Sequence, residues 1–230
     1  MRALLVVVLL LAGLAVLADR VAVGVAEDRI ASELADRGGL VGTPEVDIAG
    51  FPFLTQAVGG RYQDVRLSLD TGQLAESPGT RADVTLRGVH LPLSDAVSGS
   101  VTEVPVDRID GTATLSYDLL AGEIGSDATL APEGDGLRVT RTVELLGYTL
   151  PVSAAGTVTL DGGDLVIDVE QATGAGVEIP RFLVRQVSDL LDLRYEVPEL
   201  PFGLQLTGVV PGQDGVDLRV EATDTVLTAQ

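Results

Sequence analysis

With 230 residues, the chain is long enough for one globular domain behind a targeting segment, and its 46% hydrophobic content is too high for a disordered acidic protein. All 15 basic residues are Arg, and there is one His but no Cys or Trp, which excludes a Schiff-base lysine, a thiolate nucleophile, a Cys-ligated metal and a disulfide framework. A formal net charge of −19 repels a phosphate backbone, so nucleic acid is not an expected partner.

The N-terminus has the layout of an export signal. An unbroken apolar run over residues 3–18 follows the single basic residue Arg2. As a helix, this run covers about 24 Å, which is less than the ~30 Å hydrocarbon core of a bilayer. Asp19-Arg20 interrupts it, but residues 21–26 continue the apolar character, so a tilted or uncleaved anchor is also compatible with the sequence.

Two places in this segment suit a signal peptidase, because Ala18 and Ala26 each end a short stretch of small or apolar residues. The sequence leaves cleavage and retention open as alternatives. We assign residues 1–26 to a signal peptide or signal anchor and residues 27–230 to a single α+β domain. The protein is expected to be exported and to lie, anchored or secreted, at the outer face of the plasma membrane or in a periplasm-like envelope space.

Two amphipathic helices are expected after the apolar run. Apolar residues at three- and four-residue spacing predict the first over residues 22–40, ended by Gly38-Gly39. The second is predicted over residues 180–193, where Pro180 occupies the first position. Its apolar side carries Phe182, Leu183, Val187, Leu190 and Leu191. Single helical turns are also expected at residues 94–96 and 117–121.

Between these helices the apolar residues alternate with polar ones, a period of two that predicts half-buried strands. The expected strands cover residues 46–48, 62–65 with 67–69, 84–86 with 89–91, 101–109, 112–117, 137–145, 152–160, 165–169, 204–210 and 216–226. Glycine-rich turns at residues 133–136, 161–164 and 213–215 suit hairpin tips, so their flanking strands are expected to be antiparallel.

Strands follow strands without regular alternation with helices, which excludes a TIM barrel or a Rossmann fold and predicts an α+β fold. We expect one long, strongly curved antiparallel sheet with the N-terminal helix and the helix at 180–193 against its concave face. Four Phe and four Tyr residues are too few for an aromatic core, so aliphatic side chains must fill the interior. Such a sheet is expected to be incompletely filled, leaving room for an acyl chain.

A Phe-Pro-Phe loop carries a resemblance to a known family. The stretch Gly50–Gln56 contains two of the four Phe residues and precedes Gly59-Gly60-Arg61-Tyr62, behind the export segment. With the segments at 81–92, 111–117 and 200–204, most of residues 20–222 resembles the LmeA-like phospholipid-binding proteins of actinobacteria. This resemblance implies an exported protein with a TULIP-like lipid-binding groove, linked to lipomannan elongation and mannan-lipid upkeep in the cell envelope.

The loop itself has a physical role that does not depend on the family. Pro52 restricts its own backbone and that of Phe51, so Phe51 and Phe53 project from a stiff segment. Such rings are suited to lining a lipid entrance or dipping into a membrane, and equally suited to plugging one end of the core. The apolar residues at 180–193 are likewise open to a core interpretation.

We expect phospholipid and the plasma membrane surface as partners. The candidate lipid-binding residues are Phe51, Phe53, Leu54, Phe182, Leu183, Val187, Leu191 and Phe202. Because the acidic surface repels anionic head groups, Arg side chains near the proposed mouth are the head-group candidates. These are Arg61, Arg66, Arg181 and Arg185. No metal and no cofactor are expected.

Two other functions remain as alternatives. Acid pairs such as Glu103 with Asp107, or Asp164 with Asp168, have the residue type that glycoside hydrolysis needs, so a carboxylate-dependent hydrolase of envelope glycans is one. The other is a structural envelope module without a ligand. His90 has no second His or Cys with which to build a triad or a zinc site, and the acidic turns lack the calcium-loop pattern. The expectation is therefore a lipid-binding protein that is not an enzyme.

Overall fold

The computed structural model describes residues 1–37, 42–70, 80–99, 101–124, 128–145, 148–174, 177–178, 193–195 and 200–228. The chain divides into two compact units. Unit 1 consists of Met1–Ala75, Asp83–Gly111 and Ala222–Gln230, and unit 2 consists of Glu76–Ala82 and Thr112–Glu221.

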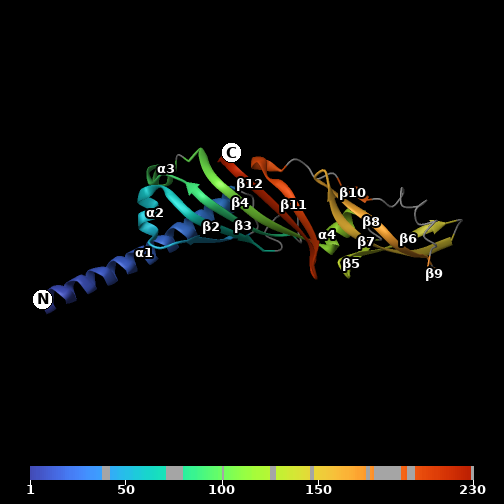
Figure 1. Cartoon of the computed structure of the whole chain (residues 1–230), viewed down its shortest axis with the longest axis horizontal. Helices are drawn as coiled ribbons and strands as arrows, with labels where there is room; N and C mark the ends of the chain where they lie inside the picture. The colour runs from blue at the N-terminus through green and yellow to red at the C-terminus, as the bar shows by residue number, and fades with distance from the viewer. Residues whose placement is uncertain are drawn as a thin grey trace. The chain divides into compact units, whose positions relative to one another are not determined.

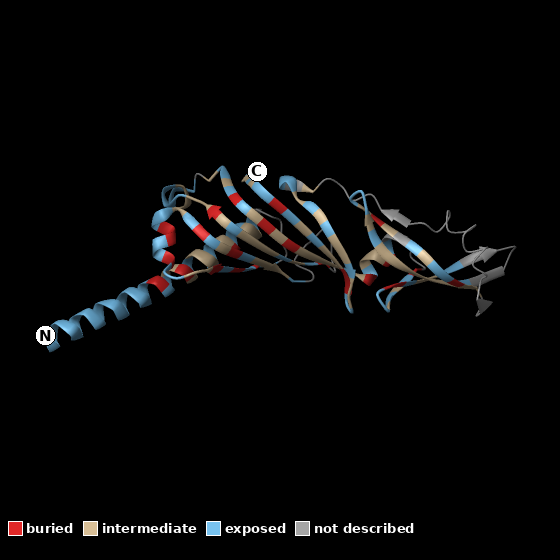
Figure 2. Cartoon of the chain, viewed as in Figure 1, coloured by how far each residue is buried: buried red, intermediate tan, exposed pale blue. Residues whose placement is uncertain are grey.

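The N-terminal helix α1 covers Arg2–Arg37 without a break (Figure 1). Asp19 and Arg20 do not interrupt it, because neither removes a backbone donor as proline does. By length and composition the helix is able to cross a membrane. Its side chains up to Ala18 are exposed, whereas Asp19, Val23 and Ala31 are buried (Figure 2). The apolar run and the amphipathic helix that the sequence predicted separately are one helix.

Six strands form the first sheet, in the order β1-β2-β3-β4-β12-β11. Their bounds are β1 Glu45–Ala49, β2 Arg61–Leu69, β3 Thr80–His90, β4 Glu103–Ser116, β11 Gln205–Pro211 and β12 Gly215–Thr228. In unit 1, helix α1 lies against β1, and the Glu27 carboxylate accepts a hydrogen bond from the backbone N–H of Ile48 at 2.8 Å. This bond satisfies a backbone donor on the edge strand. The buried apolar residues of unit 1 are Val23, Ala31, Val46, Ile48, Phe53, Ala57, Tyr62, Val65, Val89, Val106, Ile109 and Ala222.

The short helix α2, Phe53–Gly59, packs against α1 and β2. Buried Gln56 fixes it there, since its side-chain amide donates to the Ala49 carbonyl at 3.3 Å and its side-chain oxygen accepts from the Gln63 N–H at 2.9 Å. The Gly60 carbonyl after α2 accepts a hydrogen bond from the Leu91 N–H at 2.9 Å. The end of α2 therefore lies beside the start of α3, which covers Leu93–Ser98.

The second sheet lies in unit 2 and has the order β10-β8-β7-β6-β5, with β9 paired to β8. Its strands are β5 Thr129–Glu133, β6 Gly136–Leu145, β7 Tyr148–Asp161, β8 Asp164–Gly174, β9 Val177–Glu178 and β10 Leu193–Tyr195. All the pairings within it are antiparallel. The predicted hairpin turns at 133–136, 161–164 and 213–215 do join antiparallel neighbours, because their glycines and acids suit tight turns.

Helix α4, Tyr117–Ile124, follows β4 directly and packs against β5. A buried cluster of Tyr117, Leu137 and Val216 forms the core there. Around it lie the partly buried Leu120, Leu130, Val158, Val209 and Leu218. The Tyr117 hydroxyl donates to the Gly212 carbonyl at 2.7 Å, and the short 3-10 turn at Pro201–Gly203 precedes β11.

The α+β class, the N-terminal helix and the antiparallel pairing are confirmed. The helical turn expected at 94–96 lies within α3, and the one expected at 117–121 is the first part of α4. The strands, however, form two sheets where the sequence predicted one. Alternation specifies a strand but not its partners, and the chain leaves the first sheet at α4 before the hairpins β5–β8 pair with their own neighbours. Residues 179–192, which hold most of the helix expected at 180–193, lie outside the described residues, and Leu193 begins β10.

Candidate lipid-binding surfaces

The second sheet has one aliphatic face. Residues opposite one another in an antiparallel ladder share a face, and the register sets Val139 opposite Ala154 and Ala154 opposite Ala172. Continuing this alternation, the aliphatic face carries Leu130, Leu137, Val139, Val152, Ala154, Val158, Leu160, Leu165, Val169 and Ala172. Leu137, Leu165 and Ala172 are buried and the others are half-buried. All ten are saturated hydrocarbon side chains, and three of them, Leu130, Leu137 and Val158, pack in the core around Tyr117.

Short side chains run through the middle of the aliphatic face. Gly156 lies opposite Val169 at a β-bulge, and a Cβ at Gly156 would lie 2.1 Å from the Asp168 carbonyl oxygen, so a larger residue does not fit.

A charged side chain also lies on the aliphatic face. Arg141 is opposite Val152, so the ladder places it on this side of the sheet. A cation beside aliphatic surface matches the two chemical parts of a phospholipid, its phosphate and its acyl chains.

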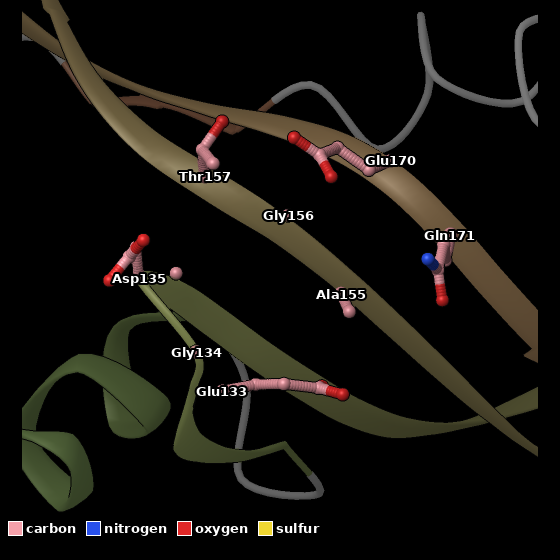
Figure 3. A pocket seen from close by; sticks show the side chains of 9 residues that line it. Glu133, Gly134, Asp135, Ala155, Gly156, Thr157, Glu170 and Gln171 are labelled. Carbon is pink, nitrogen blue, oxygen red and sulfur yellow. The ribbon is translucent and has the colours of Figure 1, made fainter.

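The reverse face of the same sheet is polar. Thr140 and Ser153 are hydrogen-bonded across β6 and β7 at 3.1 Å, and Thr159 donates to Asp168 at 3.4 Å. A cavity of about 370 Å³ opens there (Figure 3). Its lining residues are Glu133, Gly134, Asp135, Gly136, Ala155, Gly156, Thr157, Glu170 and Gln171. Three carboxylates and few carbon side chains suit neither a phosphate nor an acyl chain, so this cavity is a poor lipid site.

The Phe-Pro-Phe loop in unit 1 separates its two rings. Phe53 is buried, and its ring centroid lies 6.1 Å from that of Tyr62, so this ring is part of the core. Phe51 is 62% exposed and Leu54 is 40% exposed. The peptide bond between Phe51 and Pro52 is cis.

Asp19 of α1 holds this loop in place. Pro52, at the N-cap of α2, has no side chain that caps the helix, and the Asp19 carboxylate instead accepts the backbone N–H of Leu54 at 2.8 Å. Its other oxygen accepts from Arg20 at 2.7 Å, and the Arg20 guanidinium lies 5.3 Å from the centre of the Phe51 ring. The start of α2 and the exposed ring are therefore fixed to the point where α1 leaves its exposed apolar run.

The proposed head-group arginines of unit 1 are paired with acids. Arg61 bonds Asp107 at 2.7 Å, and Arg66 lies 3.5 Å from Asp47. Asp107 also accepts from His90 Nε2 at 3.0 Å, since an ionised carboxylate has no proton to donate. Gly88 makes room for this carboxylate, because a Cβ at Gly88 would lie 2.1 Å from Asp107 Oδ2. A phosphate would have to compete with these carboxylates for either arginine.

The hydrogen bond from His90, helped by the charge of Arg61, holds the pKa of Asp107 below its usual 3.8. A lowered pKa in the folded state means that Asp107 stabilises the fold above about pH 4 and loses this contribution as the pH falls through the folded pKa. We expect Asp107→Asn to flatten the loss of stability below about pH 4 in acid-unfolding curves followed by circular dichroism. If the acid-unfolding curve of Asp107→Asn coincides with that of the unsubstituted chain below about pH 4, this explanation is wrong.

The remaining predicted site residues have different outcomes. Phe202 is 38% exposed, in a left-handed backbone conformation with φ of 59° in the turn before β11. The others lie outside the described residues: Arg181, Phe182, Leu183, Arg185, Val187 and Leu191. Among the described residues, no three His, Asp or Glu side chains are grouped so that they would hold a metal ion.

A family model for LmeA-like phospholipid-binding proteins matches residues 17–221. The chain belongs to this family. No curated protein and no solved structure matches it significantly. The match begins two residues before Asp19, so the family domain starts where α1 starts to pack against unit 1, and it contains the whole aliphatic face.

The geometry of the LmeA-like chain does not favour the hydrolase alternative at the two acid pairs considered. Glu103 and Asp107 lie four residues apart on β4, and Asp164 and Asp168 lie four apart on β8. At about 3.3 Å per residue, their Cα atoms are about 13 Å apart. Glycosidases need their two carboxyl groups about 5–9.5 Å apart. Asp107 is also held by Arg61 and His90.

Sequence reasoning did not identify the aliphatic face, the position of Arg141 on it or the bond from Leu54 to Asp19. The strands of the second sheet were visible as alternating patterns, but only the register shows that their apolar residues gather on one face. Asp19 looked like an interruption of an apolar run, because its partner Leu54 is 35 residues away. Burying a carboxylate without a hydrogen-bond donor is costly in free energy. The presence of Asp19 inside an apolar segment therefore indicated that a distant donor must bind it.

Proposed function

We propose that this LmeA-like protein is a non-enzymatic phospholipid-binding protein of the actinobacterial cell envelope, which holds acyl chains against the aliphatic face of its second sheet. The family is a phospholipid-binding one. The observation that carries the assignment to this face is its composition. Ten aliphatic side chains share one side of four strands, seven of them beyond the core around Tyr117, while the reverse side is polar. Saturated chains gain about 0.8 kcal/mol per buried CH₂ group on such a surface.

The phosphate of the bound lipid is assigned to Arg141. This residue shares the aliphatic face with Val139 and Val152 and is exposed, so its guanidinium is able to reach a head group while the acyl chains lie along the strands. A guanidinium binds phosphate oxygens in a two-pronged geometry that suits a phosphodiester. Arg141 joins Arg61 and Arg66 as a head-group candidate, and it is the one of the three that shares a face with the aliphatic side chains of the second sheet.

The setting follows from α1. Its exposed apolar part supports export to, or anchoring at, the outer face of the plasma membrane. A phospholipid-binding protein at that surface is placed to supply or maintain lipids used there, and lipomannan or lipoglycan assembly is the process we propose. The two acid pairs examined have a spacing unsuited to glycosidic chemistry, which supports a binding role.

Organic extraction of the purified full chain, followed by mass spectrometry, tests the function. We expect phospholipid in the extract, and saturable binding of a phospholipid with a fluorescent acyl chain by the extracted protein. Unlabelled phospholipid should displace the probe, whereas deacylated glycerophosphocholine should not, because the acyl chains supply most of the contact area. A clean extract together with no saturable binding would reject the proposal.

A further inference from the structure

Exposed apolar side chains gather on α2 and α3 of unit 1. We call Phe51, Leu54, Val58, Leu93 and Val97 the apolar cap; all five are exposed, Val58 by 79% and Val97 by 73%. The two helices contact each other, and the bond from Leu91 N–H to the Gly60 carbonyl joins the end of one to the start of the other. Large apolar side chains grouped on a surface indicate a contact site.

The cap is tied to the apolar part of α1. Asp19 accepts the N–H of Leu54, and Arg20 lies over the ring of Phe51, so the cap begins where the exposed run of residues 2–18 ends. Beyond this point Val21 and Val25 are still exposed on α1. Apolar surface therefore continues along α1 past Arg20.

The length of the exposed run limits how far the cap can lie from a membrane. Residues 2–18 span about 25 Å as a helix, less than the ~30 Å hydrocarbon core. A helix this short extends through most of the hydrocarbon core only if its end at Asp19 and Arg20 lies at the head-group boundary. Arg20 is suited to that boundary, because an arginine places its stem in apolar surroundings and its charge among head groups.

We propose that the apolar cap rests in the head-group layer of the bilayer in which α1 is anchored, with Phe51 and Val97 in contact with the lipid acyl chains. The chain has a net charge of −19, but the five side chains of the cap are uncharged. The cation Arg20 lies over Phe51 and offsets the charge of Asp95, the acid on α3, so the cap is able to approach anionic lipid. This inference rests on one part of the proposed function, namely that α1 stays in the membrane. It does not require lipid on the aliphatic face.

The absence of Trp from the chain provides a direct test. Phe51→Trp and Val97→Trp each place one fluorophore in the cap, and both positions are exposed enough to accept the larger ring. Leu69→Trp is the matched control, since Leu69 lies at the far end of β2, eight residues and about 26 Å from Arg61 beside α2. The full chain of each variant is reconstituted into phosphatidylcholine–phosphatidylglycerol vesicles whose acyl chains carry bromine near the head group.

We expect F51W and V97W to be strongly quenched by the brominated lipid and blue-shifted, and L69W to show neither effect. Emission of both cap variants that matches L69W would overturn the inference and would indicate another occupant of the cap, such as a protein. Using two cap positions guards against one variant that folds poorly. If the cap fluorophores are not quenched but extraction still yields phospholipid, only the docking surface fails; if they are quenched and extracts are clean, only the proposed function fails.

Discussion

Val169→Asp is expected to remove most of the phospholipid that is bound to the aliphatic face. Val169 is half-buried on the aliphatic face, opposite Gly156, where an acyl chain would find no competing side chain. Burying a valine-sized group contributes about 1.5–3 kcal/mol, so losing this contact should weaken lipid binding about tenfold or more, and a carboxylate adds a desolvation cost. The measurement is the phospholipid-to-protein ratio after extraction, together with the affinity for the fluorescent lipid.

Gln171→Asp provides the matched control. Gln171 lies on the same strand but lines the polar cavity on the reverse face, so the same charge is added without touching the aliphatic face. Both variants keep α1, so any lipid that surrounds this helix is present in both. Val169→Thr, which is close to valine in shape, covers the case in which the aspartate variant fails to fold. Equal lipid recovery from V169T, V169D and Q171D would show that the lipid binds elsewhere.

Removing residues 1–26 is expected to destabilise unit 1, whereas removing residues 1–18 is not. The longer truncation deletes Asp19, which caps α2 through Leu54, and Val23, which is 7% exposed. The loss of buried Val23 alone corresponds to about 1.5–3 kcal/mol, and the uncapped helix adds to it. Residues 1–18 are exposed and contribute no contact of this kind.

Thermal unfolding of the 19–230 and 27–230 chains, followed by circular dichroism, measures this difference. The 19–230 chain is the control for loss of the apolar run itself. Mass spectrometry of the protein from its host is expected to find an N-terminus at or before Asp19, because cleavage after Ala26 would remove part of the fold. Equal melting temperatures for the two truncated chains would contradict the structural role of residues 19–26.

The LmeA-like site could be predicted in part. Phe51, Phe53 and Leu54 were identified as one apolar loop, but the sequence could not tell that Phe53 is buried on Tyr62 while Phe51 is exposed. Both rings have the same hydrophobicity, and their burial depends on where Asp19 and Gln56 fix the start of α2. Likewise Arg61 is a plausible head-group ligand until Asp107, 46 residues away, is seen to bond it.

Local sequence patterns were enough to predict the α+β class, the hairpins at their glycine-rich turns and the apolar N-terminal run, because each depends on neighbours within a few residues. Three features became visible in the folded chain alone: the strands divide between two sheets, Val139, Ala154 and Ala172 share one face, and Asp19 caps a helix 35 residues away. Strand register and capping between elements are contacts between distant parts of the chain. A local pattern of apolar and polar residues does not specify which distant partner makes them.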